Sequence, residues 1–213
     1  DGSVFDDAIT MYRYKEPGTY TVSATVTSGE GISRTLTAKV TTTKGYEPPE
    51  YKGYGNLAYL GIITCNVGQP KGSGSKDIEI IRDGKITRTN LGQYDTFFYR
   101  GDPHEEYIGY VFSEAYSFDK VVFTEGMQFD NGGWFENGTL RIEALIDGSW
   151  KKLDVVSEPE YPNGNKQSDF GANFETYTFT FEPVKASGIR LIGSAGGSMH
   201  FISVAELEVY GSK

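Results

Sequence analysis

The sequence predicts an all-β protein whose main domain is an antiparallel β-sandwich. Short apolar strings recur along the 213 residues, and turn-forming Gly, Asn and Asp residues separate them. Tyr and Phe, which strands favour, occur 15 and 13 times. No apolar stretch has the length and period of a substantial helix. Many short strands between regular turns are typical of sandwiches and barrels.

The first 44 residues contain two strings in which apolar and polar residues alternate. Tyr20–Val26 places its apolar side chains on one face, and Ile32–Val40 does so again after a turn at Ser28–Gly31. This pattern predicts an antiparallel hairpin with one buried face. Two strands are too few to bury that face by themselves.

A linker is expected at residues 45–49, where Pro48 and Pro49 can continue neither a helix nor a central strand. Charge changes at the same place. Residues 1–44 hold five basic and five acidic residues, so the whole net charge of −9 falls on residues 45–213.

Residues 50–213 are expected to form one domain, because short apolar strings alternate with turns along their whole length. The strings are 57–67, 78–81, 107–112, 120–123, 140–145, 176–181, 189–192 and 201–210. The turns between them are rich in Gly, Asn and Asp, as at Asp83-Gly84 and Asp147-Gly148. This arrangement predicts a single sandwich or barrel.

The N-terminal hairpin resembles the second half of a PKD-type immunoglobulin-like module. Tyr14–Val22 matches that family's Tyr-x-x-Pro-Gly-Thr-Tyr-x-Val stretch, and Asp1-Gly2-Ser3 stands where its Gly-Asp-Gly-Ser turn ends. The resemblance implies that residues 1–44 are a partial module that lacks its first strands. A generic β-hairpin is the alternative.

Residues 50–213 resemble discoidin-like domains, also called coagulation factor 5/8 type C or galactose-binding-like domains. Six motifs of that family occur in its order, namely Ile80–Gly84, Tyr94–Phe97, Tyr107–Phe112, Leu140–Ala144 with Asp147–Trp150, Gly188–Leu191 and Phe201–Gly211. Within the fold, family 32 carbohydrate-binding modules look most similar. The resemblance implies a jelly-roll β-sandwich of about eight strands, often with one structural calcium ion.

A sugar site needs an aromatic platform and a few polar groups on rigid loops, and the densest such stretch is Met127–Asn137. Trp134 and Phe135 are adjacent, so an extended chain cannot direct both into the core. We expect one of them to be exposed and to bind the ligand together with Asn131. In the alternative interpretation, Trp134 caps the core beside a turn.

Two further loops are candidates for the ligand site. The first contains Phe98, Tyr99 and Arg100, where galactose-binding relatives place a His and an aromatic residue, and His104 follows shortly after. Arg100 would contact adjacent hydroxyls with its two-pronged guanidinium, or form a surface salt bridge instead. The second loop precedes the closing strand and contains His200, which is either a ligand contact or a structural residue.

Ser198 and the segment Pro159–Gly171 are also expected to lie near the ligand. Ser198 lies in the same loop as His200 and is expected to share its access to the ligand face. The segment Pro159–Gly171 combines aromatic and polar residues in a way that suits the lining of a cleft.

The resemblance also implies a set of calcium ligands. Asp83, Asp95, Thr96 and Glu206 match the family's usual ligand positions. A hard cation takes six to eight oxygen ligands, many of them backbone carbonyls. An ion bound by these residues would bring the chain ends together and hold the ligand loops in place. It would therefore be structural and not catalytic. Alternatively, Asp83 forms an Asx-turn and Glu206 is solvated.

Composition excludes several classes of function. The single cysteine, Cys65, rules out an internal disulfide framework, and we expect it to be a buried small hydrophobe without chemistry. The acidic balance argues against nucleic acid, and no apolar run is long enough to span a membrane. The N-terminus lacks the layout of a signal peptide, so an export signal is expected to have been removed or to lie outside these residues.

Together these observations predict a non-catalytic carbohydrate-binding module of a secreted or cell-surface protein. Its expected partners are glycan and a catalytic module, most plausibly a glycoside hydrolase, in the same polypeptide. The first alternative is a calcium-stabilised adhesion or spacer module that binds protein. A glycoside hydrolase in its own right is the second, although no carboxylate pair stands in a catalytic motif.

Overall fold

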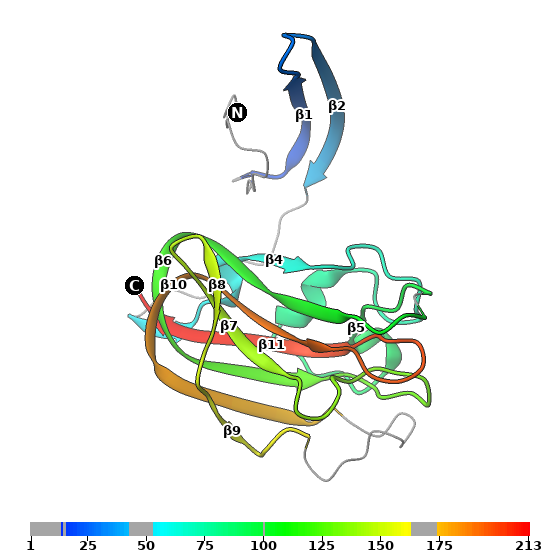
Figure 1. Ribbon diagram of the computed structural model, residues 1–213, viewed down its shortest axis with the longest axis vertical. Helices are drawn as coiled ribbons and strands as arrows, with labels where there is room; N and C mark the ends of the chain where they lie inside the picture. Colours follow the sequence, from blue (N-terminus) through cyan, green and yellow to red (C-terminus); the bar gives the residue numbers. More distant parts are fainter. Residues whose placement is uncertain (1–13, 15, 43–52, 100, 163–173) are drawn as a thin grey trace. The chain divides into compact units, whose positions relative to one another are not determined.

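The fold is that of an all-β protein in two parts. A computed structural model describes residues 14, 16–42, 53–99, 101–162 and 174–213. The chain divides into two compact units, Asp1–Pro49 and Glu50–Lys213. The first unit contains one hairpin, and the second contains the β-sandwich (Figure 1).

The hairpin of the first unit consists of β1 (Gly18–Thr27) and β2 (Ser33–Thr42), which pair antiparallel with Ala24 opposite Leu36. Its alternation separates two faces. One face carries the apolar side chains, and the other carries Thr and Ser hydroxyls that meet across the strands. Thr25 and Thr35, for example, are joined by a hydrogen bond of 2.8 Å. The hairpin predicted from alternation is therefore present.

The expectation that this hairpin buries its apolar face is wrong for the residues described. Val26 is 66% exposed and Leu36 is 71% exposed. Burial of a sheet face needs a second layer, and the described part of residues 1–49 contains only these two strands. Alternation thus predicted the strands and their faces correctly, but no other described strand covers the apolar face.

The second unit contains nine strands in one continuous antiparallel sheet that folds over on itself. The strands are β3 (Tyr54–Asn56), β4 (Ile62–Cys65), β5 (Tyr94–Asp95), β6 (Glu105–Glu125), β7 (Arg141–Ile146), β8 (Ser149–Lys152), β9 (Val156–Glu158), β10 (Thr176–Ser194) and β11 (Ser203–Ser212). Their main order is β3-β11-β6-β10-β7-β8, with β4 beside β6, β5 beside β11 and β9 beside β10. Three short 3-10 helices, η1 (Ala58–Leu60), η2 (Ile78–Arg82) and η3 (Asn90–Gly92), complete the described elements.

Two long strands, β6 and β10, pass from one layer of the sandwich to the other. Their pairing is interrupted between Thr180 and Val184 and again between Ala186 and Gly188. Before these irregularities β10 pairs with β6 and β9, and after them it pairs with β6 and β7. Such irregularities bend strands, so β6 and β10 curve around the edge and contribute to both layers (Figure 1).

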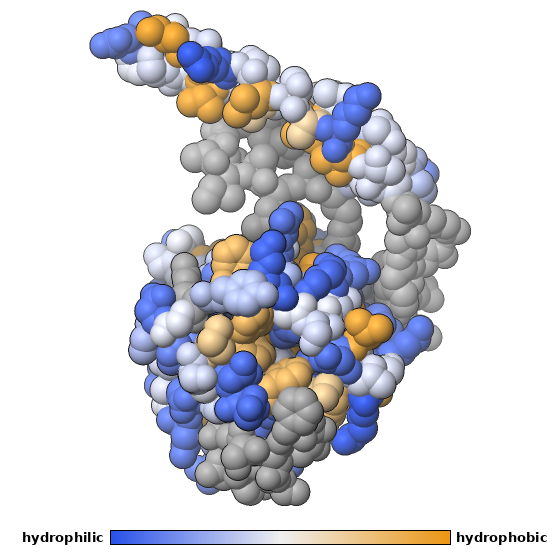
Figure 2. Space-filling model, turned by 90° about the vertical axis from the view of Figure 1, so that its right-hand side faces the viewer, coloured by the Kyte–Doolittle hydropathy of each residue, from blue (hydrophilic) through white to orange (hydrophobic). Residues whose placement is uncertain are grey.

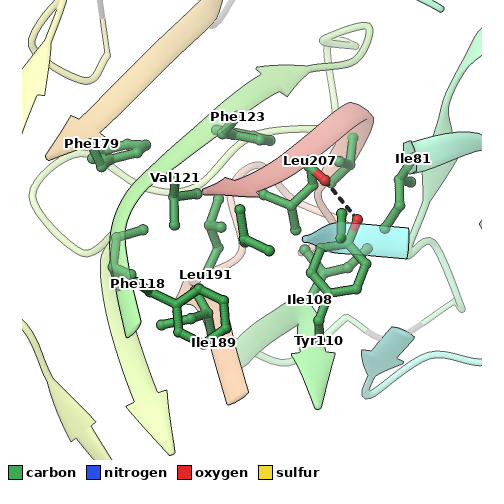
Figure 3. Packing of buried hydrophobic residues seen from close by; sticks show 14 of the residues in the cluster. Ile81, Ile108, Tyr110, Phe118, Val121, Phe123, Phe179, Ile189, Leu191 and Leu207 are labelled. Atoms are coloured by element: carbon green, nitrogen blue, oxygen red, sulfur yellow. Dashed lines mark hydrogen bonds between the residues drawn. The ribbon is translucent and has the colours of Figure 1, made fainter. Parts of the chain in front are cut away.

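The core lies between the two layers and is formed by alternate residues of the strands. On β6, Val121 and Phe123 point inward while Lys120 and Val122 lie on the outer face. Figure 3 shows inward-facing side chains of β6, β10 and β11 packed together, including the Tyr110 hydroxyl that donates a 2.6 Å hydrogen bond to the Leu207 carbonyl. Burying each such large side chain stabilises the fold by about 1.5–3 kcal/mol.

Cys65 is half-buried at the end of β4 and packs against the core. Its thiol donates a hydrogen bond of 3.0 Å to the Val67 carbonyl. Burial raises the pKa of this thiol above its ordinary value, which keeps it in the unreactive protonated form. The expectation of a small packing residue matches this environment, although the burial is only partial.

Candidate functional site

Several strand ends meet at one end of the sandwich because β6 and β10 fold over. Ser194 at the end of β10 lies opposite Glu105 at the start of β6, and Ser203 at the start of β11 lies opposite Asp95. The connecting loops therefore share this end. We call residues 96–99, 101–104, 126–138 and 195–202 the loop face.

Main-chain hydrogen bonds join the three loops of the loop face. The amide of Ala195 donates to the His104 carbonyl at 3.1 Å, and the amide of Met199 donates to the Asn131 carbonyl at 2.9 Å. The amide of Thr96 donates to the Ile202 carbonyl at 2.9 Å. The three loops singled out in the sequence thus form one surface. Figure 2 views the molecule from the end of the sandwich at which these loops lie.

Three phenylalanines form an aromatic base within the loop face. The Phe97 and Phe201 rings meet edge to face with their centroids 5.3 Å apart, and Phe129 lies 5.9 Å from Phe201. Tyr99 adds a further edge contact to Phe97 at 4.8 Å. Such pairs contribute about 0.5–1.5 kcal/mol each beyond simple burial. These contacts hold the three phenylalanine rings together and hold the Tyr99 ring against them.

Phe98 and Tyr99 are the exposed aromatic side chains of the loop face. Phe98 is 50% exposed and Tyr99 is 72% exposed. Tyr99 has a φ angle of +53°, in the left-handed region that a tyrosine seldom adopts. Such backbone strain is concentrated at functional sites, where the surrounding structure maintains it. The structure thus places both residues at the surface of the loop face, and their contact with a ligand stays a prediction.

Trp134 and Phe135 do not form the exposed platform that the sequence predicted. Trp134 is only 9% exposed and Phe135 is fully buried. The indole lies flat against Gly196, where an added Cβ atom would come within 2.1 Å of Nε1. Phe135 belongs to the core, and its amide donates a hydrogen bond to the Tyr161 hydroxyl at 2.9 Å. The prediction that one of the pair is exposed is wrong, and Trp134 instead caps the core.

Asn131 joins two loops through its main chain. Its carbonyl accepts the hydrogen bond from Met199. Gly197, with φ of +75°, approaches so closely that a Cβ atom there would lie 2.3 Å from the Asn131 oxygen. The side chain of Asn131 is half-buried at the loop face. The structure therefore places Asn131 at the predicted surface and gives it a structural role as well.

A histidine–carboxylate pair begins at the same loop face. His104 Nε2 is 2.6 Å from Glu106 Oε1, and His104 Nδ1 is 2.7 Å from the Asp102 carbonyl oxygen. Both ring nitrogens therefore face oxygen atoms that can accept hydrogen bonds, and the Glu106 residue is only 1% exposed. Glu106 was not singled out in the sequence, where nothing but its position two residues after His104 pointed to it.

His200 lies near this pair. Its ring centroid is 6.2 Å from that of His104, and its Nδ1 is 3.2 Å from the Ala195 carbonyl oxygen. His200 also has a left-handed φ angle, +46°, like that of Tyr99. The structure therefore brings His200, predicted as a ligand contact, to the same surface as His104.

Two predicted features fall outside the described residues. Arg100 is one of them. Most of the segment Pro159–Gly171 is the other, because the structure describes it only as far as Pro162. In the described part, the Tyr161 hydroxyl exchanges hydrogen bonds with the main chain of Phe135 and so has a packing role.

The four predicted calcium ligands separate into two pairs. Asp83 and Glu206 lie together, where η2 ends beside β11. Glu206 is 5% exposed, its Oε1 accepts a 3.3 Å hydrogen bond from the Gly84 amide, and its Oε2 has no hydrogen-bond partner among the described residues. Burial raises the pKa of Glu206 to about 8, with a further contribution from the charge of Asp83. Asp83 also forms the Asx-turn considered above, because Oδ1 accepts from the Lys85 amide at 2.9 Å.

Asp95 and Thr96 form the other pair, and their side chains are already occupied. The carboxylate of Asp95, 2% exposed, accepts hydrogen bonds from the amides of Gly74 at 2.8 Å and Phe97 at 3.3 Å. The hydroxyl of Thr96 accepts from the Ile202 amide at 2.9 Å. Burial raises the pKa of Asp95. Within the described ranges, no three His, Cys, Asp or Glu side chains gather as a metal cluster.

Comparison with known proteins identifies the fold of the second unit. No family model and no curated protein sequence matches the chain. Solved structures do match it. The family 32 carbohydrate-binding module of C. perfringens NanJ, solved in complex with galactose, has a TM-score of 0.51 and 19% identity, over 74% of this chain and 98% of that chain.

Two other solved structures agree with this match. A Clostridium perfringens family 32 module in complex with GalNAc-β-1,3-galactose has a TM-score of 0.50 and 20% identity, over 73% of this chain and 99% of that chain. A structure of the Streptococcus pneumoniae β-galactosidase BgaA has a TM-score of 0.54 and 14% identity, over 75% and 94%. These likenesses confirm the discoidin-like β-sandwich fold of family 32 modules. No described helix is long and apolar enough to cross a membrane.

Proposed function

We propose that residues 50–213, which have the fold of family 32 carbohydrate-binding modules, bind glycan at the loop face without catalysing a reaction. One observation carries this proposal. Phe98 and Tyr99 are exposed on the loop face, where Tyr99 contacts the aromatic base, and the same face carries His200 beside the His104–Glu106 pair. A sugar presents a weakly apolar ring face and a rim of hydroxyls, and this surface offers a partner for each.

The chemistry of such a site is simple. The C–H face of a sugar ring packs on Phe98 or Tyr99, and a sugar hydroxyl hydrogen-bonds with Nε2 of His200, whose Nδ1 faces the Ala195 carbonyl. A surface this shallow buries little of a small ligand, so we expect a Kd on the order of 0.1–1 mM per site. Because two similar structures hold galactose or GalNAc-β-1,3-galactose, galactose-type sugars are the first probes to use.

A glycan array probed with the chain tests the proposal. The wild type is expected to bind a subset of glycans, and Phe98→Ala and Tyr99→Ala are each expected to weaken this binding at least tenfold. Val156→Ala, which removes an exposed apolar side chain from β9, is the matched control and should leave binding unchanged. Release of reducing sugar would favour a hydrolase. An array without any hit would contradict the proposal and favour an adhesion or spacer module.

The origin of the chain is also part of the proposal. We infer that the sandwich is an accessory module of an extracellular glycoside hydrolase and that residues 1–44 are the end of a PKD-type spacer. The similarity to a β-galactosidase structure and the exposed apolar face of the hairpin support this. Fractionation of producing cells, with hydrolase assays on the medium, tests it. A parent protein retained inside the cell would contradict it.

A structural calcium ion is proposed at Asp83 and Glu206. A buried carboxylate with an unpartnered oxygen and a raised pKa is the group that a bound cation would stabilise. Asp83 and Glu206 would supply two carboxylate ligands, and backbone carbonyls of neighbouring residues the others. Asp95 and Thr96 lie outside this proposed site, because Asp95 does not gather with Asp83 and Glu206 into a cluster of three carboxylates among the described residues. The ion would stabilise the fold and take no part in chemistry.

A further inference from the structure

A segment that the sequence analysis did not connect with the ligand lies along the loop face. Residues 68–76 run beside residues 93–97 and are attached to them through the main chain. The amide of Lys71 donates to the Phe97 carbonyl at 2.7 Å, and the amide of Ser75 donates to the Gln93 carbonyl at 2.8 Å. The amide of Gly74 donates to Asp95 Oδ2. Three hydrogen bonds thus fix this segment against the strand that precedes Phe98.

Close packing holds the segment in this position. Gly72 and Gly74 lie against the Asp95 carboxylate, where a Cβ atom would come within 2.1 and 2.5 Å of its oxygens. Only glycine allows the two main chains to approach so closely. The carbonyl of Gly72 also accepts a hydrogen bond from the Lys76 ammonium. The Cα position of Lys71, next to Gly72, is therefore set by the fold.

The side chain of Lys71 is exposed and reaches the aromatic surface. Its Nζ lies 5.8 Å from the centroid of the Phe98 ring, within the range of a cation–π contact. An ammonium at this distance borders the ring and leaves part of it exposed. A ligand stacked on Phe98 would therefore meet a positive charge at its edge.

Within the described ranges, no carboxylate forms an ion pair with this ammonium. Three arginines of the sandwich form ion pairs with carboxylates, namely Arg82 with Glu79, Arg141 with Glu105 and Arg190 with Glu143. Among the residues that the structure describes, Lys71 has no such partner, and its contact with Phe98 is the interaction of its ammonium. An exposed cation–π contact is weak enough to give way to an anion.

We propose that Lys71 is a further ligand contact of the loop face and that it selects glycans carrying a carboxylate or sulfate group. This inference rests on the proposed glycan binding at Phe98 and Tyr99. A lysine ammonium hydrogen-bonds neutral hydroxyls as well, but a carboxylate or sulfate adds the attraction between opposite charges to the hydrogen bond. The chain has a net charge of −9, so most of its surface repels an anionic glycan. Binding of such a glycan would therefore require a local positive charge such as that of Lys71.

The experiment compares neutral and acidic glycans on one array, followed by titration calorimetry with galactose and galacturonic acid at low and high salt. The wild type is expected to prefer acidic glycans by about fivefold, and salt should weaken that preference. Lys71→Met should lose the preference for the acidic sugar, and high salt should no longer weaken the binding of that sugar, whereas Lys71→Arg should retain both effects. Lys152→Met, which removes an exposed lysine of β8, is the control and should behave as the wild type.

The outcomes separate the two proposals. Neutral glycans bound as tightly as acidic ones, or an equal loss of both on Lys71→Met, would overturn charge selection and leave the glycan-binding proposal standing. An array without any bound glycan would overturn both. Thermal unfolding of each variant shows whether it is folded. Because the Lys71 side chain is exposed, Lys71→Met and Lys71→Arg should unfold at the wild-type temperature.

Discussion

The buried carboxylate of Glu206 predicts a coupled response of stability to pH and calcium. Its pKa is raised to about 8 in the folded chain, from an ordinary value of 4.5. The folded protein therefore holds a proton that the unfolded chain releases near pH 4.5. The stability associated with this group is fully present below pH 4.5, is lost as pH rises through about 8, and changes no further above it.

The size of this loss follows from the shift in pKa. The difference between 4.5 and about 8, at about 1.36 kcal/mol per pKa unit, corresponds to about 5 kcal/mol. Solvent screening reduces this figure, so we expect the metal-free protein to lose about 3 kcal/mol between pH 5 and pH 9. Calcium stabilises the ionised carboxylate in place of the proton. Its effect on the unfolding midpoint should therefore be large at pH 9 and small at pH 5.

Chemical unfolding at pH 5, 7 and 9, in chelator and in millimolar calcium, measures this response. Glu206→Gln is uncharged at every pH, so it should remove most of the pH-dependent loss and the calcium effect together. Glu182→Gln, on an exposed part of β10, should change neither. A wild type whose midpoint ignores both pH and chelator, or a Glu206→Gln variant that still responds to calcium, would refute the reasoning.

Two further predictions concern packing and an ion pair. Gly196→Ala should destabilise the sandwich by about 1–3 kcal/mol, because its Cβ atom would overlap the Trp134 indole. The control Gly55→Ala should leave stability unchanged, because its Cβ atom meets no other atom. Equal unfolding midpoints of the two variants would contradict this prediction. Burial alone would raise the pKa of Glu143, but hydrogen bonds from two arginines, Arg190 at 2.6 Å among them, outweigh it and lower the pKa. The stability from this ion pair is present above pH 4.5 and lost as pH falls, so Glu143→Gln should cost about 2 kcal/mol at pH 7 and much less at pH 3. An equal cost at both pH values, in denaturant titrations, would show that the pair does not titrate as described.

Local alternation made the strands predictable. Tyr20–Val26 and Ile32–Val40 form the expected hairpin, and the string at 120–123 lies within β6. The length of β6 and β10 was not predictable in this way, because polar residues at their bends interrupt the apolar pattern. The exposure of the hairpin's apolar face was not predictable either, since alternation shows which side chains share a face and not whether another layer covers it.

The candidate site could be predicted only in part. The order of motifs along the chain indicated the three candidate loops, and in the structure these loops form one surface that carries Phe98, Tyr99 and His200. The burial of Trp134 depends on Gly196, which is distant in sequence, and no local pattern reports such a contact. The position of Lys71 depends on main-chain hydrogen bonds to a later strand, so it too required the structure.

The most direct test of glycan binding at the loop face is an NMR titration of the isotope-labelled chain with a glycan that binds it on the array. The proposed site predicts that the largest amide shift changes fall on Phe98, Tyr99, His104 and His200. Residues at the opposite end of the sandwich, such as Tyr210, should not respond. Saturable changes confined to that end, or to the outer faces of the sheet, would contradict the loop face as the binding site.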